Sequence, residues 1–158
     1  MAKLKLSTEF FCDYKLIALH THLEDYQLAY FLNKTLHLQL AKTKGKACLM
    51  MPSGGQFSYY TWEDTSTDIT WHCIANKLQD TQAPTAVVTL FEELPQVQYL
   101  VENEKKVDYF LKIDTEGRVD MPKILNRLRE VPATTAREIA IDTLDKKYKL
   151  IFQKENLK

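Results

Sequence analysis

Two histidines and two carboxylates lie close together in segment 20–25, just after a run of apolar residues. His20 and His22 are two positions apart, and Glu24 and Asp25 follow directly. Imidazoles and carboxylates bind metals, transfer protons and hydrogen-bond small molecules. The sequence places no third metal ligand nearby, and Glu24 is also expected to cap a helix. We therefore predict no metal site, favour structural hydrogen bonds, and keep these four side chains as candidates for binding a ligand or partner.

A second candidate lies in the aromatic segment 57–72. Rings side by side on paired strands can stack on the bases of single-stranded RNA, and the aromatic surface candidates are Tyr60, Trp62 and Trp71. The neighbouring charges at 63, 64 and 68 are acidic, and lysines occur only in the preceding segment 42–46. We therefore favour core packing for these rings and do not expect a nucleic-acid partner.

A third candidate is Asp108, near the beginning of the apolar run 107–113. Alternation places Asp108 on one face of this strand and Tyr109 on the other. A carboxylate in apolar surroundings needs a partner, because an unpaired buried charge is costly. We expect that partner to be Lys105, Lys106 or a free backbone N–H, in a structural role rather than as a general base.

Several motifs of cofactor and catalytic sites are missing from the chain. It has no GxxxxGK[ST] or GxGxxG phosphate loop, no GxSxG nucleophile elbow and no HExxH zinc motif. Its three cysteines form no CxxC pair, which argues against a disulfide framework or a thiolate zinc site and for buried thiols. We expect no cofactor, and the absence of an assembled nucleophile favours a non-enzymatic role.

The elements that position these residues belong to one domain, 1–158, because 158 residues match a typical domain length. Lys plus Arg and Asp plus Glu both number 21, and no block of like charge is visible along the chain. This balance argues against a dedicated nucleic-acid or membrane-surface protein. No apolar run reaches the ~20 residues that span a bilayer, and the start lacks the apolar region of a secretion signal. We expect a cytoplasmic location and no membrane partner.

Hydrophobic periodicity predicts two helices among many strands. One helix should begin at a capping box formed by Thr21 and Glu24 and run to about His37; the other covers 121–131, with Asp120 as its N-cap. Extended runs are predicted at 14–20, 38–43, 47–51, 57–63, 69–76, 86–91, 97–101, 107–113, 137–143 and 147–153. Few helices among consecutive strands indicate an α+β fold, a mainly antiparallel sheet with two helices packed on one face.

Two segments together resemble the bacterial IPExxxVDY family. They are LEDYQLAYFLNK at 23–34 and VDYFLKI at 107–113; where the family has Ile-Pro-Glu, this chain has Val-Glu-Asn at 101–103. The residues that match are Glu24, Asp25, Tyr26, Asn33, Asp108 and Tyr109. The resemblance implies a bacterial cytoplasmic protein and no particular chemistry. It adds Tyr26, Asn33 and Tyr109 to the candidates for ligand or partner binding.

Three functions fit these observations. The first is a non-enzymatic binding or interaction module with a protein partner, or one that dimerises through a sheet edge such as the lysine-bearing strand 147–153. The second is a small-ligand receptor or enzyme with a site around the start of the first helix, which requires that region and Asp108 to face one pocket. The third is single-stranded RNA binding on the aromatic strands. We favour the first.

Overall fold

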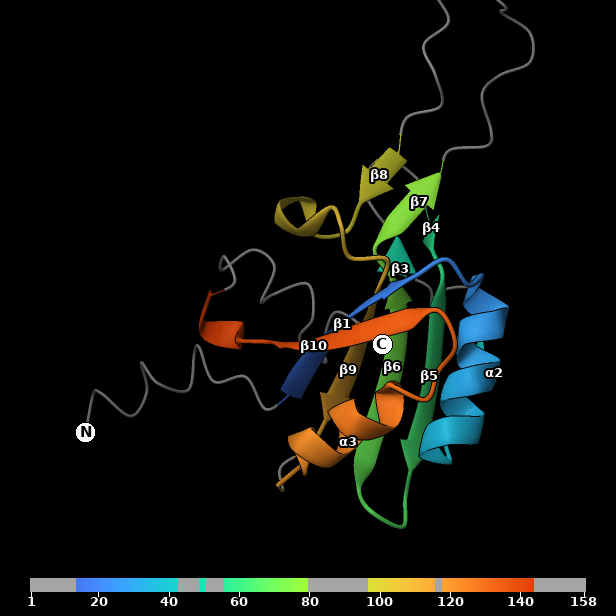
Figure 1. Ribbon diagram of the computed structural model, residues 1–158, viewed down its shortest axis with the longest axis vertical. Helices are drawn as coiled ribbons and strands as arrows, with labels where there is room; N and C mark the ends of the chain where they lie inside the picture. The colour runs from blue at the N-terminus through green and yellow to red at the C-terminus, as the bar shows by residue number, and fades with distance from the viewer. Residues whose placement is uncertain (1–13, 43–48, 51–55, 80–96, 116–117, 144–158) are drawn as a thin grey trace, which may run out of the picture.

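The computed structural model describes residues 14–42, 49–50, 56–79, 97–115 and 118–143 (Figure 1). The extended runs predicted at 86–91 and 147–153 lie outside these residues, as do Cys12 and Cys48.

Within the described ranges the main element is a six-stranded sheet in which every neighbouring pair is antiparallel. Its strands, in spatial order, are β10 (Thr134–Ile139), β1 (Tyr14–Thr21), β9 (Tyr109–Asp114), β6 (Ile69–Ala75), β5 (Tyr59–Asp64) and β2 (Ala41–Lys42). Two small antiparallel ladders join β3 (Leu49–Met50) to β4 (Gln56–Phe57) and β7 (Lys77–Gln79) to β8 (Val97–Tyr99). The ladder of β7 and β8 extends beyond one end of the main sheet (Figure 1).

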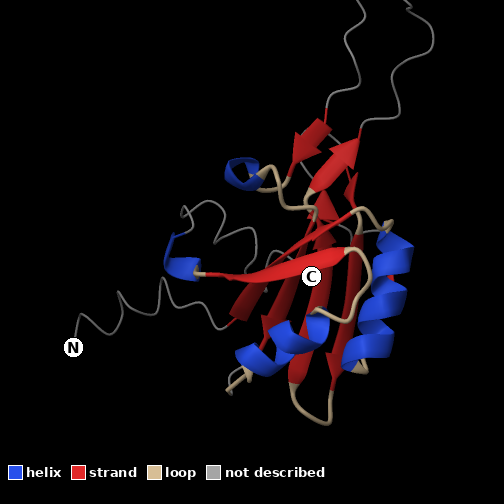
Figure 2. Cartoon of the chain, viewed as in Figure 1, coloured by secondary structure: helices blue, strands red, loops and turns tan. Residues whose placement is uncertain are grey.

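Helices α2 (Asp25–Leu36) and α3 (Met121–Leu128) cover the same face of this sheet (Figure 2). Leu28 and Leu32 of α2 belong to the same core cluster as Leu128 of α3 and the sheet residues Ile17 and Leu111. The predicted α+β architecture, with an antiparallel sheet and both helices on one face, is therefore confirmed. Two short 3-10 helices, η2 (Glu102–Glu104) and η3 (Ile141–Thr143), complete the described elements.

Alternation along the strands builds two cores, one on each face of the sheet. On β9, Leu111 and Ile113 join the cluster beneath the helices, whereas Phe110 joins a second cluster on the other face. The pairing of β1 with β9 sets Ile17 beside Leu111. Side chains two residues apart on a strand point to the same face of the sheet. A single pairing register between β1 and β9 therefore places apolar side chains in both clusters. The predicted division of segment 107–113 into two faces is confirmed for these residues.

The predicted start of the first helix is wrong by three residues. Thr21 is the last residue of β1, where it pairs with Thr134, and the N-cap of α2 is Glu24. The capping box joins Glu24 to Gln27, and the Glu24 N–H donates to Gln27 Oε1 at 2.9 Å. Pairing with β10 keeps the chain extended through Thr21, the residue that local spacing favours as a cap.

The observed ends of other strands differ from the predicted ends, because the length of a strand depends on the strand that pairs with it. Of residues 38–42, the described part of the run 38–43, only Ala41–Lys42 pairs in the sheet. The run 137–143 gives the end of β10 followed by η3. The N-cap of α3 is Asp120, as predicted: its carboxylate accepts the N–H of Lys123 at 3.1 Å.

Candidate functional site

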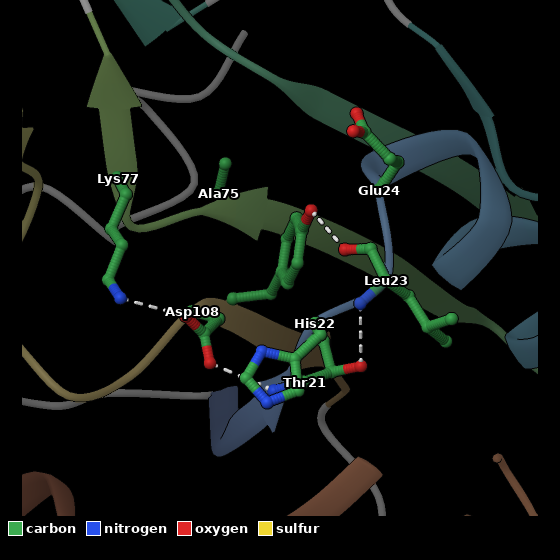
Figure 3. A pocket seen from close by; sticks show the side chains of 8 residues that line it. Thr21, His22, Leu23, Glu24, Ala75, Lys77 and Asp108 are labelled. Carbon is green, nitrogen blue, oxygen red and sulfur yellow. Dashed lines mark hydrogen bonds and ion pairs between the residues drawn. The ribbon is translucent and has the colours of Figure 1, made fainter. Parts of the chain in front are cut away.

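A pocket of about 360 Å³ opens where the end of β1 and the start of α2 meet the ends of β6 and β9 (Figure 3). Its lining residues are Thr21, His22, Leu23, Glu24, Ala75, Lys77, Asp108 and Tyr109. Four of the candidates from the sequence, His22, Glu24, Asp108 and Tyr109, therefore line one pocket. The volume lies near the lower end of the ~300–1,000 Å³ typical of small-molecule sites.

Asp108 joins three segments of the chain beneath this pocket. Its Oδ2 accepts the backbone N–H of Thr21 at 2.9 Å, and its Oδ1 lies 2.9 Å from Nζ of Lys77. The backbone N–H of Asp108 donates to the Leu19 carbonyl at 2.9 Å. Of the expected partners, the backbone N–H is thus correct, whereas the lysine is Lys77 rather than Lys105 or Lys106.

Tyr109 is held in a structural role. Its hydroxyl donates to the Leu23 carbonyl at 3.0 Å, which fixes the turn between β1 and α2 to β9. Burial is the main cause that raises the pKa of this phenol, and the neighbouring Cys73 and Asp25 raise it further. The hydroxyl therefore stays protonated at neutral pH and cannot act as a base.

Glu24 and His22 are exposed side chains of the pocket that form no ion pair in the described part of the chain, whereas the exposed Lys77 pairs with Asp108. Glu24 lies on the side of the pocket away from Lys77 (Figure 3). The His22 imidazole forms no hydrogen bond with any residue in the described part of the chain. The Glu24 carboxylate accepts the Gln27 N–H in the capping box, and an ionised carboxylate has further acceptor positions for a molecule that enters from solvent.

Three further candidates, His20 on β1 and Tyr26 and Asn33 on α2, do not line this pocket. His20 Nδ1 donates to the Lys106 carbonyl at 2.9 Å, and Asn33 bonds both the N–H and the carbonyl of Leu40. Tyr26 is exposed over 61% of its surface on α2. His20 was a candidate because it lies close to His22 and Glu24 along the chain, and Tyr26 and Asn33 because they match the family that the chain resembles. The strand and helix geometry directs all three away from the pocket.

Asp25 belongs to a separate polar contact between α2, β2 and the segment before β5. Ser58 Oγ donates to its Oδ2 at 2.5 Å, and Lys42 Nζ lies 3.6 Å from the same oxygen. Burial acts to raise the pKa of Asp25, but the hydrogen bonds from Ser58 and from the Tyr26 N–H, with the Lys42 charge, bring it below its ordinary value. This carboxylate is ionised and committed to holding the helix start.

The aromatic residues named as a surface belong mainly to the core. Trp62 and Trp71 face each other across β5 and β6, and Tyr60 and Trp71 are each only 8% exposed beneath the helices. A base-stacking platform needs open ring faces. The assignment of Tyr60 and Trp71 to an aromatic surface is therefore corrected: the alternation of β5 and β6 directs their rings towards α2 and α3.

Sequence reasoning missed a buried polar network on the opposite face of the sheet. The Tyr59 hydroxyl lies 2.5 Å from Nδ1 of His72, and His72 Nε2 lies 2.7 Å from Oδ2 of Asp114. Lys112 Nζ donates to the other carboxylate oxygen of Asp114 at 2.6 Å. The available signal was the spacing of Lys112 and Asp114, two charged residues on one face of an otherwise apolar strand.

Electrostatics favours an ionised Asp114 in this network. Burial acts to raise the pKa of Asp114, but the hydrogen bond with His72 and the charge of Lys112 outweigh it and lower the pKa. The Lys112 side chain is fully buried, and its Nζ also lies 4.9 Å from the centre of the Tyr14 ring. None of these residues lines the pocket of Figure 3, so we assign the network to stability.

Comparison with protein-family models, with curated proteins and with solved structures finds no match to this chain. The resemblance to the IPExxxVDY family and the bacterial cytoplasmic origin that it implies stay predictions. Among the described residues, no three His, Cys, Asp or Glu side chains are grouped as metal ligands would be. In the same part of the chain, every helix is too short or too polar to cross a bilayer.

Proposed function

We propose that this protein is a non-enzymatic binding module whose ligand is a small amine-bearing molecule, held in the pocket between β1, α2 and β9. The observation that supports the proposal is the convergence of His22, Glu24, Asp108 and Tyr109, from segments far apart in the chain, on one pocket. This convergence favours the small-ligand hypothesis over a role for the sheet edge alone.

Binding fits the pocket better than catalysis because its inner polar groups are already engaged. Asp108 holds Thr21 and Lys77, and the Tyr109 hydroxyl holds Leu23. A general base must reach the proton of a bound substrate, and these groups would first have to break structural contacts. Groups fixed in this way instead give a pre-formed polar wall, which lowers the entropic cost of ligand binding.

The charges of the lining residues favour a cationic group. The carboxylates of Glu24 and Asp108 carry two negative charges against one positive charge on Lys77, which leaves −1 with His22 neutral. Of the two carboxylates that line the pocket, Asp108 pairs with Lys77, whereas Glu24 forms no ion pair with any residue in the described part of the chain. An ammonium group placed near Glu24 would balance the charge and donate hydrogen bonds to it.

A titration followed by ¹⁵N–¹H correlation spectra tests this proposal with three probes of similar size: putrescine, succinate and glycerol. We expect saturable shifts with putrescine at the amides of Thr21, His22, Ala75 and Lys77, and weaker or no shifts with the other two. Equal shifts with succinate, or putrescine shifts only outside these amides, would contradict the proposal.

Self-association through a sheet edge is a second proposal, favoured by the position of β10. This strand ends the sheet, and no other described strand pairs with its outer side. Exposed edge strands can pair with a second chain. Native mass spectrometry and amide exchange at two protein concentrations test it: a dimer with concentration-dependent protection in β10 is expected, and a monomer with unchanged protection would contradict it.

A further inference from the structure

The other end of α2 holds a second pocket, of about 330 Å³, between that helix, the start of β6 and α3. Cationic side chains of Arg118, Lys123 and Arg127 line it together with apolar groups. We propose that this pocket binds a small organic anion that joins a carboxylate or phosphate to an aromatic or branched apolar body.

Among the described residues, no ion pair balances the positive charge of the pocket. Neither Arg118 nor Lys123 nor Arg127 forms an ion pair with any carboxylate in the described part of the chain. The lining includes one carboxylate, Asp120, so three positive charges and one negative charge leave +2 with His37 neutral. An anion in the pocket would gain from this charge, and guanidinium groups suit the planar geometry of carboxylate and phosphate.

Two hydrogen bonds fix the side chains of Asp120 and Arg127. The Asp120 carboxylate accepts the Lys123 N–H at 3.1 Å, so it is occupied by the cap of α3. Arg127 Nη1 donates to the Thr35 carbonyl at 3.5 Å, which ties its guanidinium to the last turn of α2. The side chains of Arg118 and Lys123 are exposed and can turn towards a ligand.

The apolar part of the lining explains why a bare inorganic ion is not the expected ligand. Trp71, only 8% exposed, is fixed in the core, and Ile69 and Ile124 are half-buried beside it. An apolar group covering this wall would lose contact with water, a gain proportional to the area buried. The two halves of the pocket thus fit the two halves of an amphipathic anion.

This proposal is independent of the ligand proposed for the first pocket. The two pockets lie at opposite ends of α2, whose 12 residues span roughly 18 Å. They share no lining residue and carry opposite net charge. Either one can fail without the other.

The test is a titration of the full chain with four probes: 3-phenylpropionate, phenyl phosphate, inorganic phosphate and 3-phenylpropylamine. The readouts are the Trp71 indole N–H and the amides of Arg118 and Lys123 in ¹⁵N–¹H spectra. We expect saturable shifts with one or both aromatic anions, and the stronger of the two identifies the preferred head group. Affinity should fall as sodium chloride is added, because salt screens exposed charges.

Variants separate the role of charge from general effects on folding. The double variant R118Q/K123Q should bind the preferred aromatic anion about tenfold more weakly. Arg129→Gln, an exposed residue at the end of α3 outside the pocket lining, is the matched control and should bind as wild type does. Equal binding of 3-phenylpropylamine, equal binding of inorganic phosphate, or unchanged affinity in R118Q/K123Q would each overturn the proposal.

Discussion

The carboxylate of Asp108 accepts the backbone N–H of Thr21 at 2.9 Å, across 87 positions of the chain. This one bond ties the end of β1 to the start of β9, and the ion pair of Asp108 with Lys77 brings in the segment after β6. The inner wall of the first pocket therefore depends on a side chain that is already satisfied before any ligand arrives.

Removal of this carboxylate should destabilise the protein. In Asp108→Ala the Thr21 N–H loses its acceptor in a partly buried place, and we expect a loss of ~1–3 kcal/mol in the free energy of unfolding. Lys77→Met, which removes only the half-exposed partner, should cost at most ~1 kcal/mol. Urea denaturation measures both. Equal stability of Asp108→Ala and wild type would show that the bond contributes nothing.

The buried ion pair of Lys112 and Asp114 should be far more sensitive than any surface pair. Lys112→Met leaves the Asp114 carboxylate with less compensation in the second core, at an expected cost of ~3–5 kcal/mol. Lys34→Met, an exposed lysine on α2, is the control and should stay within ~0.5 kcal/mol of wild type. The midpoints of denaturant unfolding of the two variants test this prediction. Similar midpoints for Lys112→Met and Lys34→Met would argue against a structural role for the network.

Asp114 should also make stability depend on acid pH. Its pKa in the folded protein lies below the ordinary value of 3.8, so its contribution is complete above that value and is lost as pH falls through the folded pKa. Wild type should therefore lose stability steeply below about pH 4. Asp114→Asn, less stable at neutral pH, should show a shallower acid decline. Parallel pH curves for the two proteins would contradict this assignment.

Cys73 should be inert towards alkylating reagents in the folded protein. Burial raises the pKa of its thiol to about 12, and the Asp25 charge adds to the effect, so almost no thiolate is present at neutral pH. In the variant C12S/C48S, iodoacetamide should modify Cys73 only as fast as the protein unfolds. Peptide mass spectrometry over a urea series measures this rate. Rapid modification without urea would show that the thiol is accessible.

Local patterns predicted the elements of this fold better than they predicted its contacts. The helical spacing of Leu28 and Leu32 and the alternation from Phe110 to Ile113 are properties of a single segment, and both were read correctly. The N-cap of α2 was predicted wrongly, because pairing with β10 extends β1 through Thr21. Pairing between strands is set by distant segments, which no local window contains.

The prediction of the candidate site was incomplete for the same reason, because its contacts depend on distant segments of the chain. Asp108 needed a partner on physical grounds, but the choice of Lys77 depends on the path of the chain after β6. Likewise His72 meets Asp114 because β6 and β9 are neighbours, a fact of topology and not of spacing.

The meaning of the zero net charge also changes with the structure. The chain shows no block of like charge, so its sequence alone indicates no strongly charged surface. The fold instead gathers Arg118, Lys123 and Arg127 at one end of α2 and places Glu24 and Asp108 at the other. The acidic pair forms because Glu24 and Asp108, far apart in sequence, become neighbours when the chain folds, whereas the basic group comes from the single segment 118–127.

The most direct test of the proposed function is the dissociation constant of putrescine for wild type, Glu24→Gln and Glu138→Gln. Glutamine keeps an acceptor for the cap of α2 but removes the charge from the pocket, whereas Glu138 is exposed on β10 outside it. We predict binding about fivefold weaker in Glu24→Gln and unchanged in Glu138→Gln. No saturable binding to wild type, or equal affinity in Glu24→Gln, would contradict the account.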